Sequence, residues 1–167
     1  AMQNTTTGLN NTAVGGAALI SNTTGGTNTA IGRQALYLNT TASNNTAVGY
    51  QAGLAVTTGT LNTFVGASAG DAVTTGANNI CIGYDSGSEG VSLTTGSKNI
   101  LIGNFSNTSA VNVEQEIVIG YDIGGGGTNT VRIGTPGGNA TLGLDGSDTS
   151  WAAASDERLK KDVATST

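Results

Sequence analysis

The sequence contains little of what most globular proteins use to build a catalytic site. His is absent, and the 167 residues include one Cys, one Pro and 4% aromatic residues. Without His, the His-based catalytic triads and His-ligated zinc sites are excluded. A single Cys excludes an intrachain disulfide framework and a CxxC-type metal site. We therefore expect no metal ion and no cofactor, and we do not expect an enzyme.

Charge is also scarce. Charged residues make up 10% of the chain, with 6 basic and 11 acidic side chains and a net charge of -5. Nucleic-acid binding needs a clustered Lys/Arg face, so nucleic acid is not an expected partner. No apolar run approaches the roughly 20 residues of a membrane span, which argues against membrane insertion. Because 37% of the chain is hydrophobic, it does not have the composition of a charged disordered tail either.

What the chain has instead is a repeat. Gly and Thr supply 27 residues each and Asn supplies 17. The unit NTAVG at 11–15 recurs as NTAIG, NTAVG, NTFVG, NICIG, NILIG, EIVIG and TVRIG, each closing on a Gly. These closing glycines are at 15, 32, 49, 66, 83, 103, 120 and 134, so their spacing is mostly 17 residues. A constant period of this length is typical of a solenoid.

Each unit combines a short β-like run with a Gly and a Thr-Thr-Gly turn, and it is too short and too Gly-rich for helices. We predict an all-β fold, a parallel β-roll or β-solenoid of about 17 residues per coil, with two short strands and two corners per coil. Neighbouring coils would lie about 4.8 Å apart. The Asn four residues before each closing Gly is predicted to form an amide ladder along the stack, or else only to favour turns.

Both faces of the predicted strand are largely apolar. One face carries a column of Val or Ile before each closing Gly, including Val48, and the other carries Ala, Phe, Cys81, Leu and Val. A lone solenoid would leave one face in water, so we expect other copies of the chain to cover it. We assign Val48 to the inward, buried column, and Val48→Asp should then abolish assembly. If the Cys81 column lines a symmetry axis instead, three copies of Cys81 would approach one another.

These repeats, of the form N-x-A-[IV]-G-x-x-[AS], resemble the head domains of YadA-type trimeric autotransporter adhesins. The resemblance implies a left-handed parallel β-roll in each chain and three rolls packed into a homotrimer. It covers residues 4–106 well and weakens through Gly134. The adhesin heads favour 14 residues per coil, and only the step from Gly120 to Gly134 has that length.

A second resemblance lies at the other end. The segment SDERLKKDV, residues 155–163, is similar to the signature that opens the S74 intramolecular chaperone of phage tail fibres, tailspikes and some bacterial fibres. The family's self-cleavage motif maps onto Ser155, Asp156 and Lys160, with Ser155 as nucleophile. Only 12 residues follow Ser155, so we expect an inactive, truncated start of that module. The alternative is an ordinary charged helix start capped by Ser155.

Together the patterns divide the chain into four parts. We expect residues 1–3 to be a cloning remnant, 4–103 regular β-roll repeats, 104–150 degenerate repeats and a tip region, and 151–167 a junction followed by the S74-like start. We expect the distal segment of an extracellular fibre, on a bacterial surface or a virion tail. Its function would be adhesion to a host or prey cell through a glycan or protein.

Candidate ligand-binding residues are aromatic and acidic side chains that we expect on the outside of the roll or in its irregular regions. Three tyrosines share the column directly after the closing Gly, and aromatic rings can stack on sugars. An inserted loop at 85–91, a break at 104–116 and a patch at 145–151 supply further candidates. The complete set is Tyr50, Tyr84, Tyr121, Asp85, Glu89, Phe105 and Trp151. The tyrosines could instead cover a corner or pack against a neighbouring chain.

Three other functions need to be weighed. The main alternative is a purely structural shaft that spaces another receptor-binding part. Ice binding requires Thr-x-Thr on a flat strand, whereas the regular threonines here are adjacent pairs, so we reject it. A depolymerase would need paired carboxylates. Asp85 with Glu89, or Glu114 with Glu116, are such pairs by sequence only.

Overall fold

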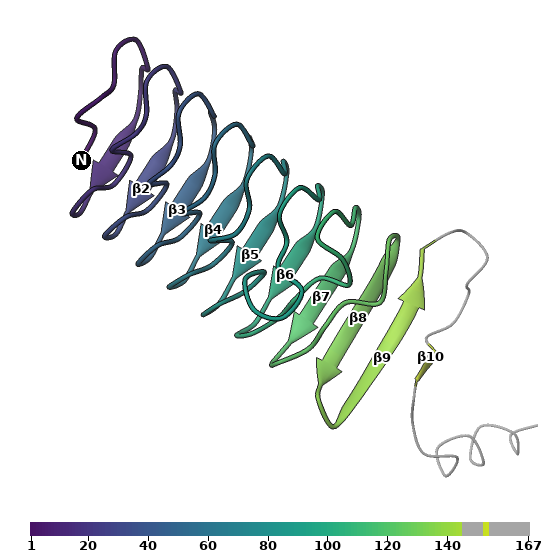
Figure 1. Ribbon diagram of the computed structural model, residues 1–167. Helices are drawn as coiled ribbons and strands as arrows, with labels where there is room; N and C mark the ends of the chain where they lie inside the picture. The colour runs from purple at the N-terminus through teal and green to yellow at the C-terminus, as the bar shows by residue number, and fades with distance from the viewer. Residues whose placement is uncertain (145–151, 154–167) are drawn as a thin grey trace, which may run out of the picture.

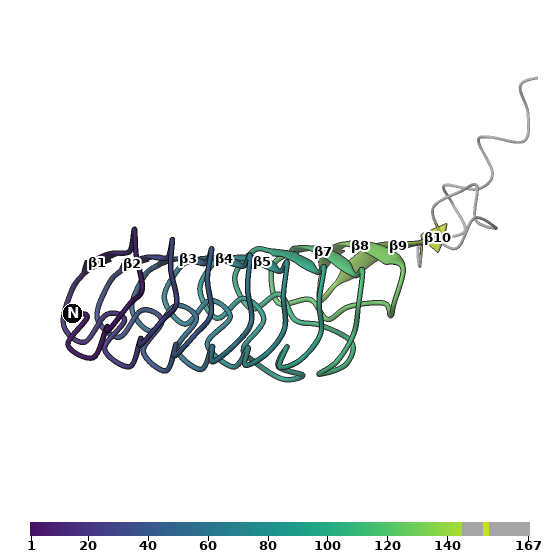
Figure 2. The ribbon, with the colours of Figure 1, turned by 90° about the horizontal axis from the view of Figure 1, so that it is seen from above.

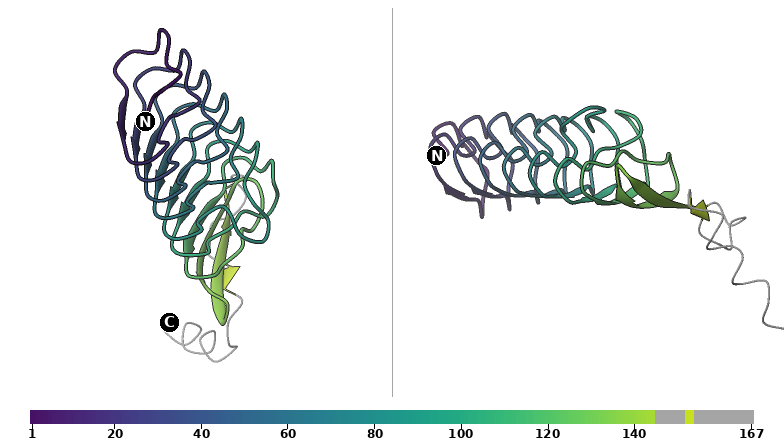
Figure 3. Two further views of the ribbon diagram at one scale, coloured as in Figure 1. Left: turned by 60° about the vertical axis from the view of Figure 1, so that its left-hand side comes forward. Right: turned by 90° about the horizontal axis from the view of Figure 1, so that it is seen from below.

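The computed structural model describes residues 1–144 and 152–153. In this part of the chain the fold is all-β and contains no helix, and it winds into a β-solenoid of about 7 turns with about 17 residues per turn. The coils stack in sequence order, so each coil contacts the one before it and the one after it (Figures 1 and 3). This confirms the predicted solenoid and its period.

Each coil contributes one short strand to a single sheet. Neighbouring strands from β1 to β8 are parallel and their equivalent repeat positions are in register; for example Ala47 lies opposite Phe64. Seen from above, the strands form one flat side of the solenoid (Figure 2). The seven coil strands are β1 Thr12–Val14, β2 Thr29–Ile31, β3 Thr46–Val48, β4 Thr63–Val65, β5 Ile80–Ile82, β6 Ile100–Ile102 and β7 Ile117–Gly120.

The regular winding ends in a hairpin. β8 (Thr130–Thr135) still pairs in parallel with β7, but β9 (Gly138–Gly143) turns back and pairs antiparallel with β8. β10 (Ala152–Ala153) adds to β9, again antiparallel. The shorter 14-residue step therefore precedes a change from coil to hairpin.

The return side of each coil differs from the prediction, because it is not a second strand. The residues two and four after a closing Gly have positive φ, as in Gln34 (61°) and Leu36 (50°). An alternation of left-handed residues cannot extend into a strand. The return side nevertheless bonds from coil to coil, since the Leu36 amide donates to the Ala52 carbonyl at 3.0 Å.

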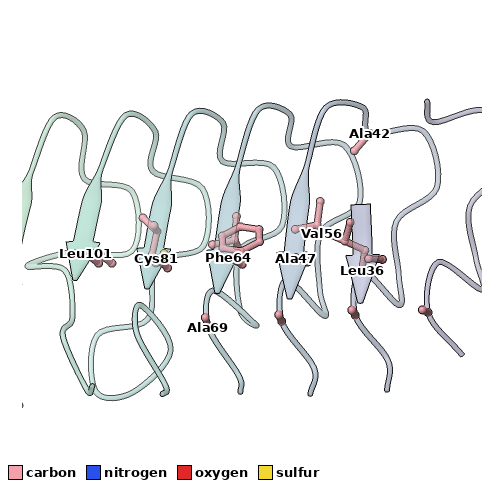
Figure 4. Close-up of a cluster of buried hydrophobic side chains, with 14 of the residues drawn as sticks. Leu36, Ala42, Ala47, Val56, Phe64, Ala69, Cys81 and Leu101 are labelled. Atoms are coloured by element: carbon pink, nitrogen blue, oxygen red, sulfur yellow. The ribbon is translucent and has the colours of Figure 1, made fainter. Parts of the chain in front are cut away.

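The middle residue of each coil strand points into the solenoid and forms its core (Figure 4). Ala30, Ala47, Phe64, Cys81, Leu101 and Val118 have no exposed surface. In this narrow interior a small side chain on the strand side is matched by a larger one on the return side, and a large one by glycine. Small Ala30 shares the interior with Leu36, whereas bulky Phe64 lies between Gly53 and Gly70, where a Cβ would come within 2.7 Å and 2.3 Å of its ring.

Two assignments of strand faces need correction. The Val and Ile column does not point into the coil but lies on its outside, where Val14 is 57% exposed and Ile82 37% exposed. Cys81 lies inside the coil and is fully buried, so its column does not face outward toward a symmetry axis. The prediction that Val48 belongs to the inward column is therefore wrong: the Val and Ile column faces outward, and the column that contains Cys81 faces inward.

The predicted Asn ladder is confirmed. Asn45 Oδ1 accepts the Asn62 backbone N–H at 2.9 Å, and Asn45 Nδ2 donates to the Gly59 carbonyl of the next coil at 2.8 Å. Each Asn side chain thus accepts a hydrogen bond from the backbone N–H of the equivalent residue in the next coil and donates one to a carbonyl at a corner. The rungs are Asn11, Asn28, Asn45, Asn62, Asn79 and Asn99, and the backbone N–H of Glu116 donates to Asn99 Oδ1 at the end of the ladder.

Candidate functional site

Two surface features of the solenoid are unlike the rest of its surface. Within residues 1–144 and 152–153 no cluster of three or more His, Cys, Asp or Glu side chains could hold a metal ion. Over the same residues, no helix is long and apolar enough to cross a membrane. The acidic pair Glu114 and Glu116 is divided between solvent and interior, because Glu116 is fully buried while Glu114 is exposed.

Glu116 has a structural role at the end of the Asn ladder. Its carboxylate accepts the Ser109 N–H at 3.0 Å and the Gly127 N–H at 2.6 Å. A carboxylate bonded on both oxygens to backbone donors, and with no exposed surface, has no room for a substrate. The depolymerase pair Glu114 and Glu116 is therefore ruled out by position.

The first surface feature is the outer sheet face, which we define as the outward Val and Ile column of the strands. These side chains belong to successive coils about 4.8 Å apart, so they form one continuous apolar row along the solenoid. A large contiguous apolar surface on a protein generally marks an interaction site. The members more than a third exposed are Val14, Ile31, Val65, Ile82, Ile102 and Ile133.

The second feature is the aromatic cluster, which we define as Tyr84, Phe105 and Tyr121. The ring centroids of Tyr84 and Phe105 are 5.2 Å apart at an interplanar angle of 87°. Those of Phe105 and Tyr121 are 6.0 Å apart at 84°. Both pairs have the edge-to-face geometry that aromatic rings prefer. The three rings come from three successive coils, within three residues of the ends of β5, β6 and β7.

Backbone geometry explains why these rings meet. Tyr84 and Tyr121 directly follow a closing Gly, whereas the sixth coil has Asn104 at that position and its aromatic residue one place later. Asn104 Oδ1 accepts the Tyr84 N–H at 2.9 Å. Phe105 adopts a left-handed φ of 57° and donates its N–H to the Tyr84 carbonyl at 2.9 Å. The shift by one residue places the Phe105 ring between the two tyrosines.

Acidic side chains border the cluster on one side. A hydrogen bond to the Asp85 carboxylate, together with the negative charges of Asp85 and Glu89, raises the pKa of the exposed Tyr84 phenol. Burial also raises the pKa of Asp71, against a hydrogen bond from Ser88 that lowers it, and the Asp85 charge raises it further. Tyr84 therefore stays neutral at ordinary pH and keeps its hydroxyl as a donor.

The inserted loop at 85–91 is tied to both neighbouring coils, and it projects beside β5 and β6 in Figure 1. Ser88 Oγ donates to the Ser68 carbonyl at 2.6 Å, toward the preceding coil. Thr108 Oγ1 donates to the Val91 carbonyl at 3.1 Å, and Asn107 Oδ1 accepts the Glu89 N–H at 3.1 Å, from the following coil. These bonds hold Asp85 and Glu89 next to the aromatic cluster.

The structure thus brings together Tyr84, Asp85, Glu89, Phe105 and Tyr121 among the predicted ligand residues. Tyr50 is separate: the Arg33 guanidinium lies over its ring at 5.7 Å, and Ala67 occupies the same column in the coil between Tyr50 and Tyr84. Trp151 and the S74-like residues Ser155, Asp156 and Lys160 lie outside the described residues.

Sequence reasoning missed Asn104 and the role of Phe105 as the ring that joins two tyrosines. A signal was present, because the column after the closing Gly has Tyr, Asn, Tyr in successive coils and an aromatic residue follows that Asn at once. The signal could not give the ring contacts, since they depend on the left-handed φ of Phe105.

No protein-family model, curated protein sequence or solved structure matches the chain.

Proposed function

We propose that the chain is the distal segment of a homotrimeric extracellular fibre that recognises the surface of a target cell. The observation that carries the proposal is the outer sheet face, a row of exposed Val and Ile along the whole solenoid. Water-exposed apolar surface of this length favours association, because burying the part of each side chain that is still exposed is worth roughly 0.5–1.5 kcal/mol. Identical chains are the most economical cover for a face that repeats along its length.

The two sequence resemblances support the same conclusion. Repeats like those of YadA-type adhesin heads imply left-handed rolls side by side in a trimer. The similarity of residues 155–163 to the S74 signature implies a fibre on a bacterial surface or a virion tail. Neither resemblance implies an activity of the solenoid beyond binding.

Recognition is favoured over a plain shaft by the aromatic cluster. A spacer needs only the regular coils and the Asn ladder, whereas Tyr84 and Tyr121 are 48% and 56% exposed and are held by neighbouring rings. The shaft remains the second candidate function, because the coil-to-coil hydrogen bonds of the ladder make a stiff, repetitive rod.

The trimer interface can be tested with one charge on each side of the solenoid. Val65→Asp places a carboxylate on the outer sheet face, where assembly would bury it without a partner, so we expect trimers to dissociate into folded monomers. Leu38→Asp is the matched control, because Leu38 is similarly exposed but lies on the return side. Light scattering measures the mass and circular dichroism checks the fold. Equal masses for both variants would contradict the proposed interface.

A further inference from the structure

We propose that the aromatic cluster, with Asp85 and Asp122 beside it, binds a neutral glycan chain that lies along the solenoid axis. This inference rests on the proposed function and adds to it a place, a direction and a class of ligand. The ligand is identified by its chemistry: apolar sugar faces for the rings, hydroxyl groups for the carboxylates, and no negative charge of its own.

Ring spacing sets the direction of the ligand. Tyr84 and Tyr121 occupy the same column two coils apart, which places them roughly 10 Å from each other along the solenoid axis. Phe105 is half-buried between them and lies edge-to-face with both. The two tyrosine rings can therefore each stack on a sugar ring of one chain, and Phe105 keeps their separation fixed.

The site is held in place before a ligand binds. The Phe105 N–H donates to the Tyr84 carbonyl, and the Asp122 N–H donates to the Asn104 carbonyl, both at 2.9 Å. The side chains of the cluster thus stand on coils that are hydrogen-bonded to one another. A site that is ordered in advance loses less conformational entropy on binding, so modest stacking contacts yield measurable affinity.

Charge selects the class of glycan. Asp85 and Asp122 directly follow the two tyrosines, and Glu89 lies close enough to Tyr84 to raise its pKa. Carboxylates accept hydrogen bonds from sugar hydroxyl groups but repel uronic and sialic acids.

No basic residue of the described ranges compensates these charges at the cluster. Arg33 lies over Tyr50, and Arg132 donates to the Gly125 carbonyl with its side chain in the column of the coil interior. Lys98 precedes β6, at the opposite end of that strand from Phe105. An anionic glycan would therefore find repulsion without a counter-charge.

The test is titration calorimetry of the full 167-residue chain with two probes of equal length, a neutral N-acetylglucosamine hexasaccharide and an anionic galacturonate hexasaccharide. A glycan array of neutral and acidic sugars is run in parallel. We expect saturable binding of neutral glycans on the array and no binding of acidic glycans. If no neutral glycan binds, or if acidic glycans bind more tightly, the inference is overturned.

Variants locate the site. Tyr121→Ala and Phe105→Ala should each lower the affinity for the best neutral glycan by about tenfold or more, since each removes a stacking ring or its spacer. Tyr50→Ala is the control, an exposed tyrosine outside the cluster, and should stay within about twofold. Asp85→Asn should raise the affinity for the acidic probe. Equal losses in Tyr50→Ala and Tyr121→Ala would place the binding elsewhere.

Light scattering on every variant separates this inference from the proposed function. A trimer that binds no neutral glycan overturns the inference and leaves the proposed fibre standing. A monomer that binds neutral glycan and loses the binding in Tyr121→Ala supports the site and overturns the trimer. If Tyr121→Ala dissociates the trimer, the cluster is a contact between subunits or with a protein, and the inference fails.

Discussion

At the residue scale, the interior of the solenoid depends on pairs of side chains whose sizes balance. Phe64 fits only because the facing positions of its own coil and the preceding one are Gly70 and Gly53. Gly70 also has a φ of +59°, which favours Gly over residues with a Cβ. The middle position of the strands holds side chains from Ala to Phe in different coils. A change of size at one core position therefore requires a compensating change at the position that faces it.

Gly70→Ala is expected to destabilise the fold by about 3 kcal/mol. The added Cβ would lie 2.3 Å from the Phe64 ring. Overpacking costs about 1–3 kcal/mol and the left-handed backbone roughly 1–2 kcal/mol more. Urea unfolding followed by circular dichroism measures the change. Phe64→Leu in the same chain should recover part of the loss, and Gly137→Ala, with open space around it, should change stability little.

Cys81 is expected to be inert in the folded protein. Its full burial raises the pKa of the thiol to about 12. Because the thiolate is the reactive form, hardly any is present at pH 8, and the side chain is also out of reach of a reagent. A colorimetric thiol reagent should find no reactive group in the native chain and one per chain in denaturant. Complete labelling of the native protein would show that the Cys81 column is not inside the coil.

At the element scale, the Asn ladder links the coils more strongly than strands of three residues could alone. Asn62 accepts the Asn79 N–H at 2.9 Å and donates to the Gly76 carbonyl at 2.9 Å and to Asn45 Oδ1 at 3.1 Å. All these groups are buried, so none can turn to water instead. The ladder explains how a chain with few large side chains keeps its coils in register.

Asn62→Ala should lower the free energy of unfolding by about 3 kcal/mol. The substitution leaves the Asn79 N–H and the Gly76 carbonyl without partners, and each unsatisfied buried group costs about 1–3 kcal/mol. Asn112→Ala is the matched control, since Asn112 is exposed and has neither a positive φ nor a ladder bond. Similar urea midpoints for the two variants would show that Asn62 is only a turn former.

The strand side of the coil could be predicted from sequence, but the return side could not. Strands such as Ile80–Ile82 follow from β-branched residues before a regularly spaced Gly, and the Asn ladder follows from its phase. On the return side, Gln34, Ser68 and Asp85 adopt left-handed φ without being Gly or Asn. Their conformation is imposed by coil-to-coil hydrogen bonds, which no local pattern reveals.

For the candidate site, sequence supplied the residues but not their grouping. Tyr84 and Tyr121 share a column, so their alignment was predictable from the period. The separation of Tyr50 from the cluster was predictable only in part: Ala67 in the column between Tyr50 and Tyr84 is visible in the sequence, whereas the Arg33 contact with Tyr50 at 5.7 Å is not. Alternate residues of a strand point to opposite faces, but the sequence does not say which face lies inside the coil. Only the path of the coil determines that Ala47 points inward and Val48 outward.

At the scale of the whole molecule, the outer sheet face determines what the solenoid becomes. One side of the sheet covers a complete core, with Phe64, Leu101 and Val118 fully buried. The other side, along the flat row of strands in Figure 2, exposes Val and Ile on coil after coil. Nothing in residues 1–144 and 152–153 covers that row, and two further copies are the proposed cover.

The most direct test of this account is the mass of the unaltered chain in solution. Light scattering coupled to size-exclusion chromatography should give about three times 16.4 kDa, unchanged over a tenfold dilution in the micromolar range. A mass of one chain at every concentration, with the β-solenoid intact by circular dichroism, would contradict the central claim that identical chains cover the outer sheet face.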